Sequence, residues 1–485
     1  MENTFLRYEQ FGAVGDGKVD DLPAIVATHA EANRLGLPVK ATDGAVYYIG
    51  GKNISAVIKT DVDFGKAKFV IDDRSLEDIR SYVFSVESDF EFESVEIPTL
   101  SVGQKKLSLG KEGSYLVHVY DESHPVFIRK GLNMNSGTPT QEVFTVDGEG
   151  NIGQSVNFDY PTVTKAEARR TDDKPITVKG GIFVTVANQQ ESFYRYHHRG
   201  FHIMRSHVTL CGYEHYVEGE LDHGAPYHGF VRADHATDLT VKDAIVTPRF
   251  VYYTESKIPG KPVPMGSYDL SFWSSVDVRC INVKQTVDIT DSRYWGVYTS
   301  NFCKNLTVDN CVFSRFDAHM GVTGFAIRNS KLGHQGIQLI GFGQGVIENT
   351  EVFSASFFSL RPDYGATWSG DIAVKDCVWY PRYAGASLFS SQNSEDHDFG
   401  YPCSEPSRIT VDGLRICDGA FADAPVYLLP KFTDEPIDGE KTAPYGRVKE
   451  LKIKGLTAET GRDVELCRRP ELYTDTVISF EDQNI

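Results

Sequence analysis

The segments L-T-V-D-N-C-V-F (306–313), F-A-I-R-N-S-K-L (325–332) and G-V-I-E-N-T-E-V (345–352) can be aligned with one another. Each carries a β-branched residue two positions before an asparagine, and the three asparagines are spaced by 19 and 20 residues: Asn310, Asn329 and Asn349. A unit of this length cannot bury its own apolar face, so its copies must stack. Because each unit is a short alternating strand that ends in a turn residue, the sequence predicts a parallel β-helix.

The same pattern returns with looser spacing elsewhere in the chain, at D-L-T-V-K-D-A-I (238–245), D-I-A-V-K-D-C-V (371–378), R-I-T-V-D-G-L-R (408–415) and L-K-I-K-G-L (451–456). Strands of successive turns lie about 4.8 Å apart, so equivalent residues form columns along the axis. Asparagine at a bend tolerates the left-handed conformation and can stack its amide on the next turn. Cys311 and Cys377 share one phase next to this ladder, and we expect both to be buried apolar residues.

The composition indicates one large soluble protein. The chain has 485 residues, with 49 Lys and Arg against 67 Asp and Glu, a net charge of −18. It has no run of basic residues, which argues against a nucleic-acid partner, and no long apolar run, which argues against a membrane span. The eight cysteines show no CxxC pair, so neither disulfides nor a cofactor are predicted. The first residues lack a signal-peptide pattern, so we expect a cytoplasmic protein, or a secreted one if a leader was removed.

The N-terminal sequence carries a family resemblance. F-G-A-V-G-D-G-K-V-D-D (11–21) precedes an amphipathic segment at 23–36. This opening resembles that of the pectin-lyase-like superfamily, which includes polygalacturonases, polysaccharide lyases and phage tailspike depolymerases. The resemblance implies an all-β, right-handed parallel β-helix whose open end is capped by the N-terminal helix. We expect Asp20 or Asp21 to cap that helix, glycines 12, 15 and 17 to adopt positive φ, and Asp16 to be structural.

Four regions are expected along the chain. Residues 1–75 would form the cap and the first turns, and residues 176–425 the central β-helix with the active-site cleft. Residues 426–485 would supply C-terminal turns and a tail. Residues 76–175 are rich in charge and alternating β segments that do not stack on the ladder, which predicts an inserted β-rich subdomain.

Eight of the fourteen histidines lie between residues 191 and 235, interleaved with tyrosines. One interpretation is a metal site, but none of these histidines form an H-x-x-x-H pair on a predicted helix, as metal-binding helices do. The other is the rim of a sugar-binding cleft, where aromatic faces stack on sugars and polar tips bind hydroxyl groups.

The segment 291–311 resembles the polygalacturonase stretch in which a tryptophan strand precedes C-x-N-V-T-I-x-N. K-L-G-H-Q-G-I-Q-L-I-G (331–341) is similar to that family's histidine strand, and R-F-D-A-H-M-G (315–321) lies where the family has its aspartates. The resemblance implies that Asp317 is the catalytic acid and His334 the active-site histidine. The family's N-T-D and R-I-K motifs are not present.

Counting from the ladder asparagines gives a predicted cleft. Arg315 and His334 are each five residues beyond an asparagine, and His319 and Gln338 are each nine beyond, so each pair is expected on adjacent turns. The catalytic candidates are Asp317, His319, His334, Asp363 and Asp291. The candidate substrate-binding residues are Arg293, Tyr294, Trp295, Arg315, Gln335, Gln338, Arg361, Tyr364 and Trp368.

These residue types suit carbohydrate chemistry. Glycoside hydrolysis uses two carboxyl groups flanking the scissile bond, and here Asp317 would act with Asp363 or Asp291. A polysaccharide lyase is the alternative, with a histidine or Tyr294 as base and an arginine on the uronate carboxylate. A glycan-binding, tailspike-like protein without activity is the third. In each case the expected partner is an oligosaccharide or polysaccharide, with a homo-oligomer as a further possibility.

Overall fold

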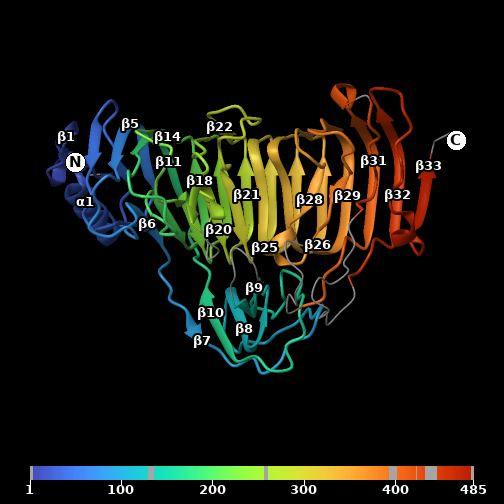
Figure 1. The fold of residues 1–485 in the computed structure, drawn as a ribbon. Helices are drawn as coiled ribbons and strands as arrows, with labels where there is room; N and C mark the ends of the chain where they lie inside the picture. The colour runs from blue at the N-terminus through green and yellow to red at the C-terminus, as the bar shows by residue number, and fades with distance from the viewer. Residues whose placement is uncertain are drawn as a thin grey trace. The chain divides into compact units, whose positions relative to one another are not determined.

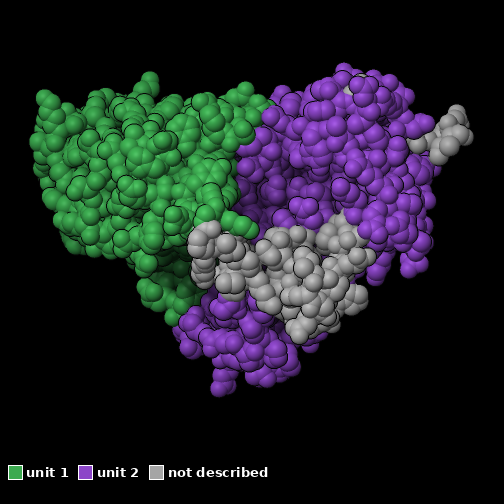
Figure 2. All heavy atoms as spheres, in the orientation of Figure 1, with its two compact units in different colours: residues 1–92, 169–298 green, residues 93–168, 299–485 purple. Residues whose placement is uncertain are grey.

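The computed structural model describes residues 4–128, 136–255, 260–392, 401–421, 423–431 and 445–481. The chain divides into two compact units, residues 1–92 with 169–298 and residues 93–168 with 299–485 (Figure 2). Both are built mainly from strands that pair in parallel with the strand one turn further along the chain. Among the described residues, no helix is long and apolar enough to cross a bilayer.

In the second unit the strands follow one another as rungs of a parallel β-helix (Figure 1, yellow to red). Their bounds are β23 (Tyr298–Asn301, beginning at the last residue of the first unit), β24 (Lys304–Asp309), β25 (Val312–Arg328), β26 (Lys331–Glu348), β27 (Glu351–Val352), β28 (Phe358–Leu360), β29 (Trp368–Trp379), β30 (Phe389–Ser390), β31 (Arg408–Ile416), β32 (Glu450–Ala458) and β33 (Val477–Glu481). The long strands β25 and β26 each pair with several others: β25 with β23, β24 and β26, and β26 also with β27, β28 and β29.

Three columns of buried residues run through this unit. The first stacks Val308, Ile327, Ile347, Val374, Val411 and Ile453. The second stacks Phe313, Leu332, Val352, Trp379 and Ile416, and the third stacks Phe316, Ile337, Phe358 and Phe389. All these side chains are at most 1 % exposed, so the apolar columns predicted from the repeat are confirmed.

The asparagine ladder is also confirmed. Asn310, Asn329 and Asn349 have φ angles of 52°, 51° and 46°, in the left-handed region. Asn349 Nδ2 donates to Asn329 Oδ1 at 2.8 Å, and Asn329 Nδ2 donates to Asp309 Oδ1 at 2.7 Å. The next residues in phase, Cys311 and Cys377, are buried as expected.

The first unit repeats the arrangement. Its strands are β1 (Asp16–Asp20), β2 (Val39–Lys40), β3 (Val46–Ile49), β4 (Ala56–Ile58), β5 (Val62–Asp72), β6 (Phe84–Glu87), β11 (Ile176–Val186), β12 (Phe201–Met204), β13 (Ser206–Cys211), β14 (Glu214–Glu218), β15 (His228–Asp234), β16 (Thr237–Lys242), β17 (Ile245–Val246), β20 (Tyr268–Trp273), β21 (Val276–Ile281) and β22 (Lys284–Gln285). A separate antiparallel hairpin joins β18 (Tyr252–Glu255) and β19 (Pro262–Met265). The segment predicted at 238–245 supplies β16, whose Val241 stacks between Leu210 and Cys280.

The single α-helix of the described chain, α1 (Leu22–Leu35), contacts β4 and ends at Gly36 with a φ of 66°. Gly12, Gly15 and Gly17 have positive φ angles, as predicted. Asp21 is the N-cap residue of α1, as predicted, although its side chain makes no capping hydrogen bond, and Asp20 Oδ1 accepts from the amide of Leu22 at 3.2 Å. The Asp21 carboxylate instead accepts hydrogen bonds from the amides of Val14 and Gly15, and so fixes the glycine-rich turn. The role of α1 as an end cap remains a prediction.

Residues 93–168 contain an antiparallel sheet of their own, formed by β7 (Glu93–Ser94), β8 (Tyr115–Val126), β9 (Thr138–Val146) and most of β10 (Lys165–Arg170). An apolar cluster that includes Val117, Phe144 and Tyr160 packs against it. Its buried Glu142 accepts from Lys304 Nζ of β24 at 2.6 Å, which ties this sheet to the β-helix of the same unit. The predicted domain boundaries are not tested by these features and remain predictions.

Candidate functional site

Strand β25 presents the central part of the predicted site. Phe316 and Ala318 point into the core, so the residues that alternate with them, Arg315, Asp317 and His319, lie on the outer face of the sheet. The sharing of one face that the period-two pattern predicts is therefore confirmed for Asp317 and His319. The next turn adds Gln338, which pairs with Asp317, and then Ser359.

Two guanidinium groups hold the Asp317 carboxylate. Arg315 Nη2 lies 2.7 Å from Oδ2, and Arg361 Nη1 lies 3.0 Å from both carboxylate oxygens. The Asp317 side chain is 0 % exposed, and that of Arg315 is 3 % exposed. Ion pairs at such depth form only with good geometry, because both charges have lost their water.

Arg361 bridges Asp317 to a second carboxylate. Its Nε and Nη2 atoms donate to Asp363 at 3.0 and 2.8 Å, and Asp363 is 18 % exposed. Arg361 lies just after β28 and begins the turn Pro362–Tyr364, where its amide donates to Leu339 O at 3.1 Å. The three candidates Asp317, Arg361 and Asp363 are therefore in contact with one another.

His319 lies beside this network. Its Nδ1 is 2.7 Å from Asn301 Oδ1, and its ring meets the edge of Tyr364 at 5.5 Å. An amide oxygen only accepts, so Nδ1 carries the proton and Nε2 keeps its lone pair. Burial, with Arg361 next, lowers the pKa of His319 from 6.5 to about 4, so the ring is neutral at pH 7. Asn301 was not predicted; it lies on β23, one turn before His319, where the register between β23 and β25 shifts.

The register predicted for His334 is wrong. Arg315 pairs with Gly336, not with His334, and Gln338 pairs with Asp317, not with His319. Phe313 of β25 pairs with Leu332 of β26, and Arg315 pairs with Gly336. The β26 segment between these pairs is two residues longer than the β25 segment, so β26 forms a bulge and the register shifts by two residues. His334 and Gln335 lie in that bulge, and Gln335 O accepts from Gln338 Nε2 at 2.6 Å.

Two of the predicted substrate-binding aromatic residues are buried away from any ligand. Trp368 is 0 % exposed, and its Nε1 donates to Gly343 O at 2.9 Å, which places it in the core. Tyr364 is 4 % exposed, packed in a cluster that includes Phe127, Phe302 and Met320. Phe127 comes from the segment before the ladder, and for that reason turn counting could not place it.

Four candidates belong to the first unit: Asp291, Arg293, Tyr294 and Trp295. There, Arg293 Nη2 lies 2.6 Å from Asp291 Oδ2, and Tyr294 stacks on Phe250 at 4.8 Å. Asp291 therefore has an ordinary local ion pair within its own unit, and its predicted role as a second carboxyl group remains a prediction.

The histidine-rich stretch pairs with aspartates. His202, His207, His215 and His223 bond to Asp234, Asp238, Asp269 and Asp222, respectively, at 2.7–2.8 Å. Within the part of the chain that the structure describes, no three His, Cys, Asp or Glu side chains gather in a way that could hold a metal ion.

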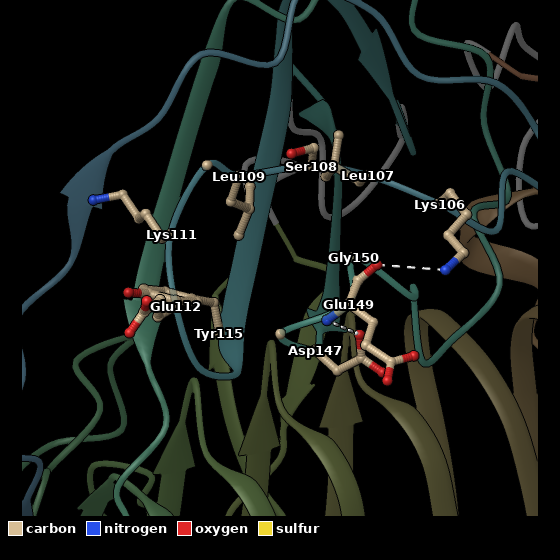
Figure 3. Close-up of a pocket in the computed structure, with 12 residues that line it drawn as sticks. Lys106, Leu107, Ser108, Leu109, Lys111, Glu112, Tyr115, Asp147, Glu149 and Gly150 are labelled. Carbon is tan, nitrogen blue, oxygen red and sulfur yellow. Dashed lines mark hydrogen bonds between the residues drawn. The ribbon is translucent and has the colours of Figure 1, made fainter.

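A separate hollow of about 470 Å³ lies in the antiparallel sheet region of the second unit (Figure 3). It is lined by residues 106–112, Tyr115 and residues 147–150. Lys106 Nζ donates to Glu149 O at 3.4 Å across it. The hollow contains none of the predicted site residues.

Comparison with known proteins decides the fold. The structure is similar to the tailspike gp61 of Pseudomonas phage phi297, with a TM-score of 0.58 and 12 % identity over 99 % of this chain and 84 % of that one. It is also similar to the tailspike gp49 of Pseudomonas phage LKA1, with a TM-score of 0.51 and 11 % identity over 95 % and 82 % of the two chains. The fold is a right-handed parallel β-helix. This confirms the fold implied by the N-terminal resemblance.

No family model and no curated protein matches the sequence. The tailspikes are similar to this chain in fold alone, so the similarity does not establish the chemistry of the site.

Proposed function

We propose that this protein is a carbohydrate-active enzyme that hydrolyses glycosidic bonds, and that the cluster of Arg315, Asp317, His319, Arg361 and Asp363 is its catalytic centre. The observation that carries the proposal is the guanidinium of Arg361, which holds two carboxylates beside a neutral histidine. Of the two carboxylates, Asp363 is the one that solvent reaches, so a carboxyl group and a neutral base lie beside each other, as acid–base cleavage of a glycosidic bond requires. The fold shared with the phage tailspikes agrees with this proposal.

The burial of the residues suggests different roles for them. Asp363 is partly exposed and is the carboxyl group that a sugar can reach. Asp317 is fully buried, so we assign it to positioning: it fixes Arg315 and Arg361, and through Arg361 it fixes Asp363. This role replaces that of catalytic acid, which the family resemblance implied.

His319 would act as the base. Its Nε2 lone pair is available because Nδ1 donates to Asn301, and a neutral imidazole can take a proton from an attacking water. The ionised Asp363, held in place by Arg361, would face the positive charge that develops at the anomeric carbon, and the proton that His319 takes from water would pass to the departing sugar oxygen. The bond between the anomeric carbon and the bridging oxygen breaks, and water supplies the new hydroxyl group.

One observation favours β-elimination as a second candidate. A neutral histidine with one bare nitrogen next to two arginines is also suited to take the C5 proton of a uronate. Against it, Arg315 and Arg361 are already balanced by Asp317 and Asp363, so little positive charge is left to neutralise a substrate carboxylate.

The products distinguish the two reactions. Incubation with neutral and uronate-containing polysaccharides, followed by mass spectrometry, should show one added water for each cut. Products that lack this water and absorb in the ultraviolet would identify elimination. An Asp363→Asn variant that cleaves as fast as the wild type would contradict the assignment of the centre.

A further inference from the structure

The first unit carries a second group of ionisable and aromatic side chains on the outer face of its sheet. Strands β6, β12, β15 and β20 are neighbours there, and Ser85, His202, Arg232 and Ser271 form one row across them. Asp234 pairs with Trp273 two residues further along. Phe201, Val231 and Leu270 on the opposite face are fully buried, so this row is the outward one.

Hydrogen bonds fix the conformation of the polar side chains in this group. Arg232 holds Asp234 through Nε at 2.6 Å and Nη2 at 2.8 Å, and His202 Nε2 lies 2.7 Å from the same carboxylate. Arg232 Nη1 also donates to His228 Nδ1 at 2.5 Å. The side chains of His202, Arg232 and Asp234 are 12–21 % exposed, so they form a fixed surface that solvent still reaches. A surface fixed in advance loses little conformational entropy when a ligand binds.

Aromatic rings surround the network. Tyr82 stacks on His202 at 4.4 Å, and Tyr196 packs on His228 at 4.6 Å. Trp273 is half-buried, with Arg232 above its ring at 5.1 Å. Indole and phenol faces next to fixed hydrogen-bonding groups are the usual components of a sugar-binding surface.

One polar atom in this group has no partner among the described residues. The Tyr82 side chain is 8 % exposed, and its buried hydroxyl makes no hydrogen bond there. A buried hydroxyl without a partner costs about 1–3 kcal/mol, so its retention needs an explanation. A ligand hydroxyl group would supply the missing bond.

The charges of the surface are balanced. Arg232 is paired with Asp234, and of the two further charges near this surface Arg80 lies close to His198 and Glu87 accepts from Ser85 Oγ. Burial lowers the pKa of His198 to about 4 and that of His228 to about 2, so both rings are uncharged at pH 7. No excess positive charge remains to attract a uronate or another anionic sugar.

We infer that the outer face of β6, β12, β15 and β20 is a binding subsite for uncharged sugar units of a glycan, with Trp273 and Tyr82 as its main contacts. This inference rests on the proposed function for the class of ligand, but it concerns binding in the first unit and not bond cleavage. We expect the subsite to prefer neutral over anionic sugars, because the charges of its surface are balanced.

The test is calorimetric titration of the whole protein with neutral oligosaccharides and with uronate oligosaccharides of the same length. The wild type should bind a neutral series, and Trp273→Ala should weaken that binding at least tenfold while Trp273→Phe retains most of it. Tyr82→Phe should weaken binding severalfold without lowering the thermal unfolding temperature, because the lost hydroxyl has no protein partner. Tyr253→Ala, at an exposed ring on β18, is the matched control and should bind as the wild type does.

Absence of binding to any neutral oligosaccharide, preference for the uronate series, or wild-type affinity in both Trp273→Ala and Tyr82→Phe would overturn the inference. Turnover separates it from the proposed function. Trp273→Ala should raise KM for a neutral polysaccharide substrate and leave kcat unchanged, whereas Asp363→Asn should remove kcat and keep the affinity. A wild type that binds neutral sugars without cleaving any polysaccharide would refute the proposed function and support the subsite.

Discussion

Arg361 Nη1 lies 3.0 Å from both carboxylate oxygens of Asp317, a residue with no exposed surface. The two residues are 44 positions apart in the sequence and meet across β26, which pairs with β25 on one side and with β28 on the other. This contact joins the stability of the second unit to the geometry of the proposed catalytic centre.

Asp317→Asn should strongly destabilise the second unit, because it leaves the buried Arg315 without the Asp317 carboxylate and removes one of the two carboxylates that Arg361 contacts. Removing one partner of a buried ion pair typically costs about 3–5 kcal/mol. Urea unfolding followed by fluorescence measures the loss. The control is Asp371→Asn, whose half-exposed ion pair with Arg408 should contribute less than about 1 kcal/mol. Equal losses in the two variants would contradict the structural role of Asp317.

His319→Gln should reduce turnover by about 100-fold or more while preserving glycan affinity, because the variant keeps a polar side chain but loses the base. Initial-rate kinetics and calorimetric titration measure the two quantities separately. The matched control is His334→Gln, in the bulge of β26, which should keep most of the activity. If only His334→Gln inactivated the enzyme, the histidine chosen by family resemblance would be the correct one.

The stability of the second unit should rise between pH 4 and pH 6.5, and His319 should contribute to the rise. Its folded pKa is about 4 against 6.5 for the ordinary side chain, so in this window the unfolded chain binds more protons than the folded chain. Stability is therefore lost as the pH falls through the window and is complete above it. The gain between pH 4 and pH 6.5 should be smaller in His319→Gln than in the wild type, and an identical gain would exclude a depressed pKa.

Glu142→Gln should loosen the antiparallel sheet from the β-helix of the second unit. Glu142 and Lys304 are 2–3 % exposed, and Glu142 also accepts from the amides of Asn157 and Phe158. We expect faster limited proteolysis within residues 93–168 and a loss of about 3–5 kcal/mol. Glu149→Gln, on an exposed turn of the same sheet, should digest as the wild type does.

The asparagine ladder can be tested by two substitutions at one position. Asn329 has a φ of 51° and bonds to both neighbouring turns, so Asn329→Ala should lose about 1–2 kcal/mol from backbone strain alone, besides the ladder bonds. Asn329→Gly removes the same bonds but tolerates the left-handed backbone, so its melting temperature should lie above that of Asn329→Ala. The reverse order would show that the backbone conformation is not what selects asparagine there.

The ladder could be predicted from the sequence because each rung repeats its neighbour. Asn310, Asn329 and Asn349 share the left-handed backbone conformation at equivalent positions, and their spacing fixes the apolar columns two residues away. The pairing of His334 could not be predicted in this way, because a bulge of two residues in β26 shifts the register without interrupting the repeat.

Burial by distant segments is the second reason why part of the candidate site could not be predicted from the sequence. Tyr364 and Trp368 have the residue types of sugar-binding platforms, but Phe127 and its cluster cover the first, and the second points into the core. Turn counting places residues along the axis, and it does not show which outer faces are covered by other parts of the chain.

The most direct test of the proposed catalytic centre is mass spectrometry of the products that the wild type and Asp363→Asn release from neutral and uronate-containing polysaccharides. We predict fragments that carry one added water per cut from the wild type, and no fragments from the variant, which should still bind the same polysaccharide. Fragments without the added water, equal cleavage by the variant, or no cleavage by the wild type would contradict the proposal.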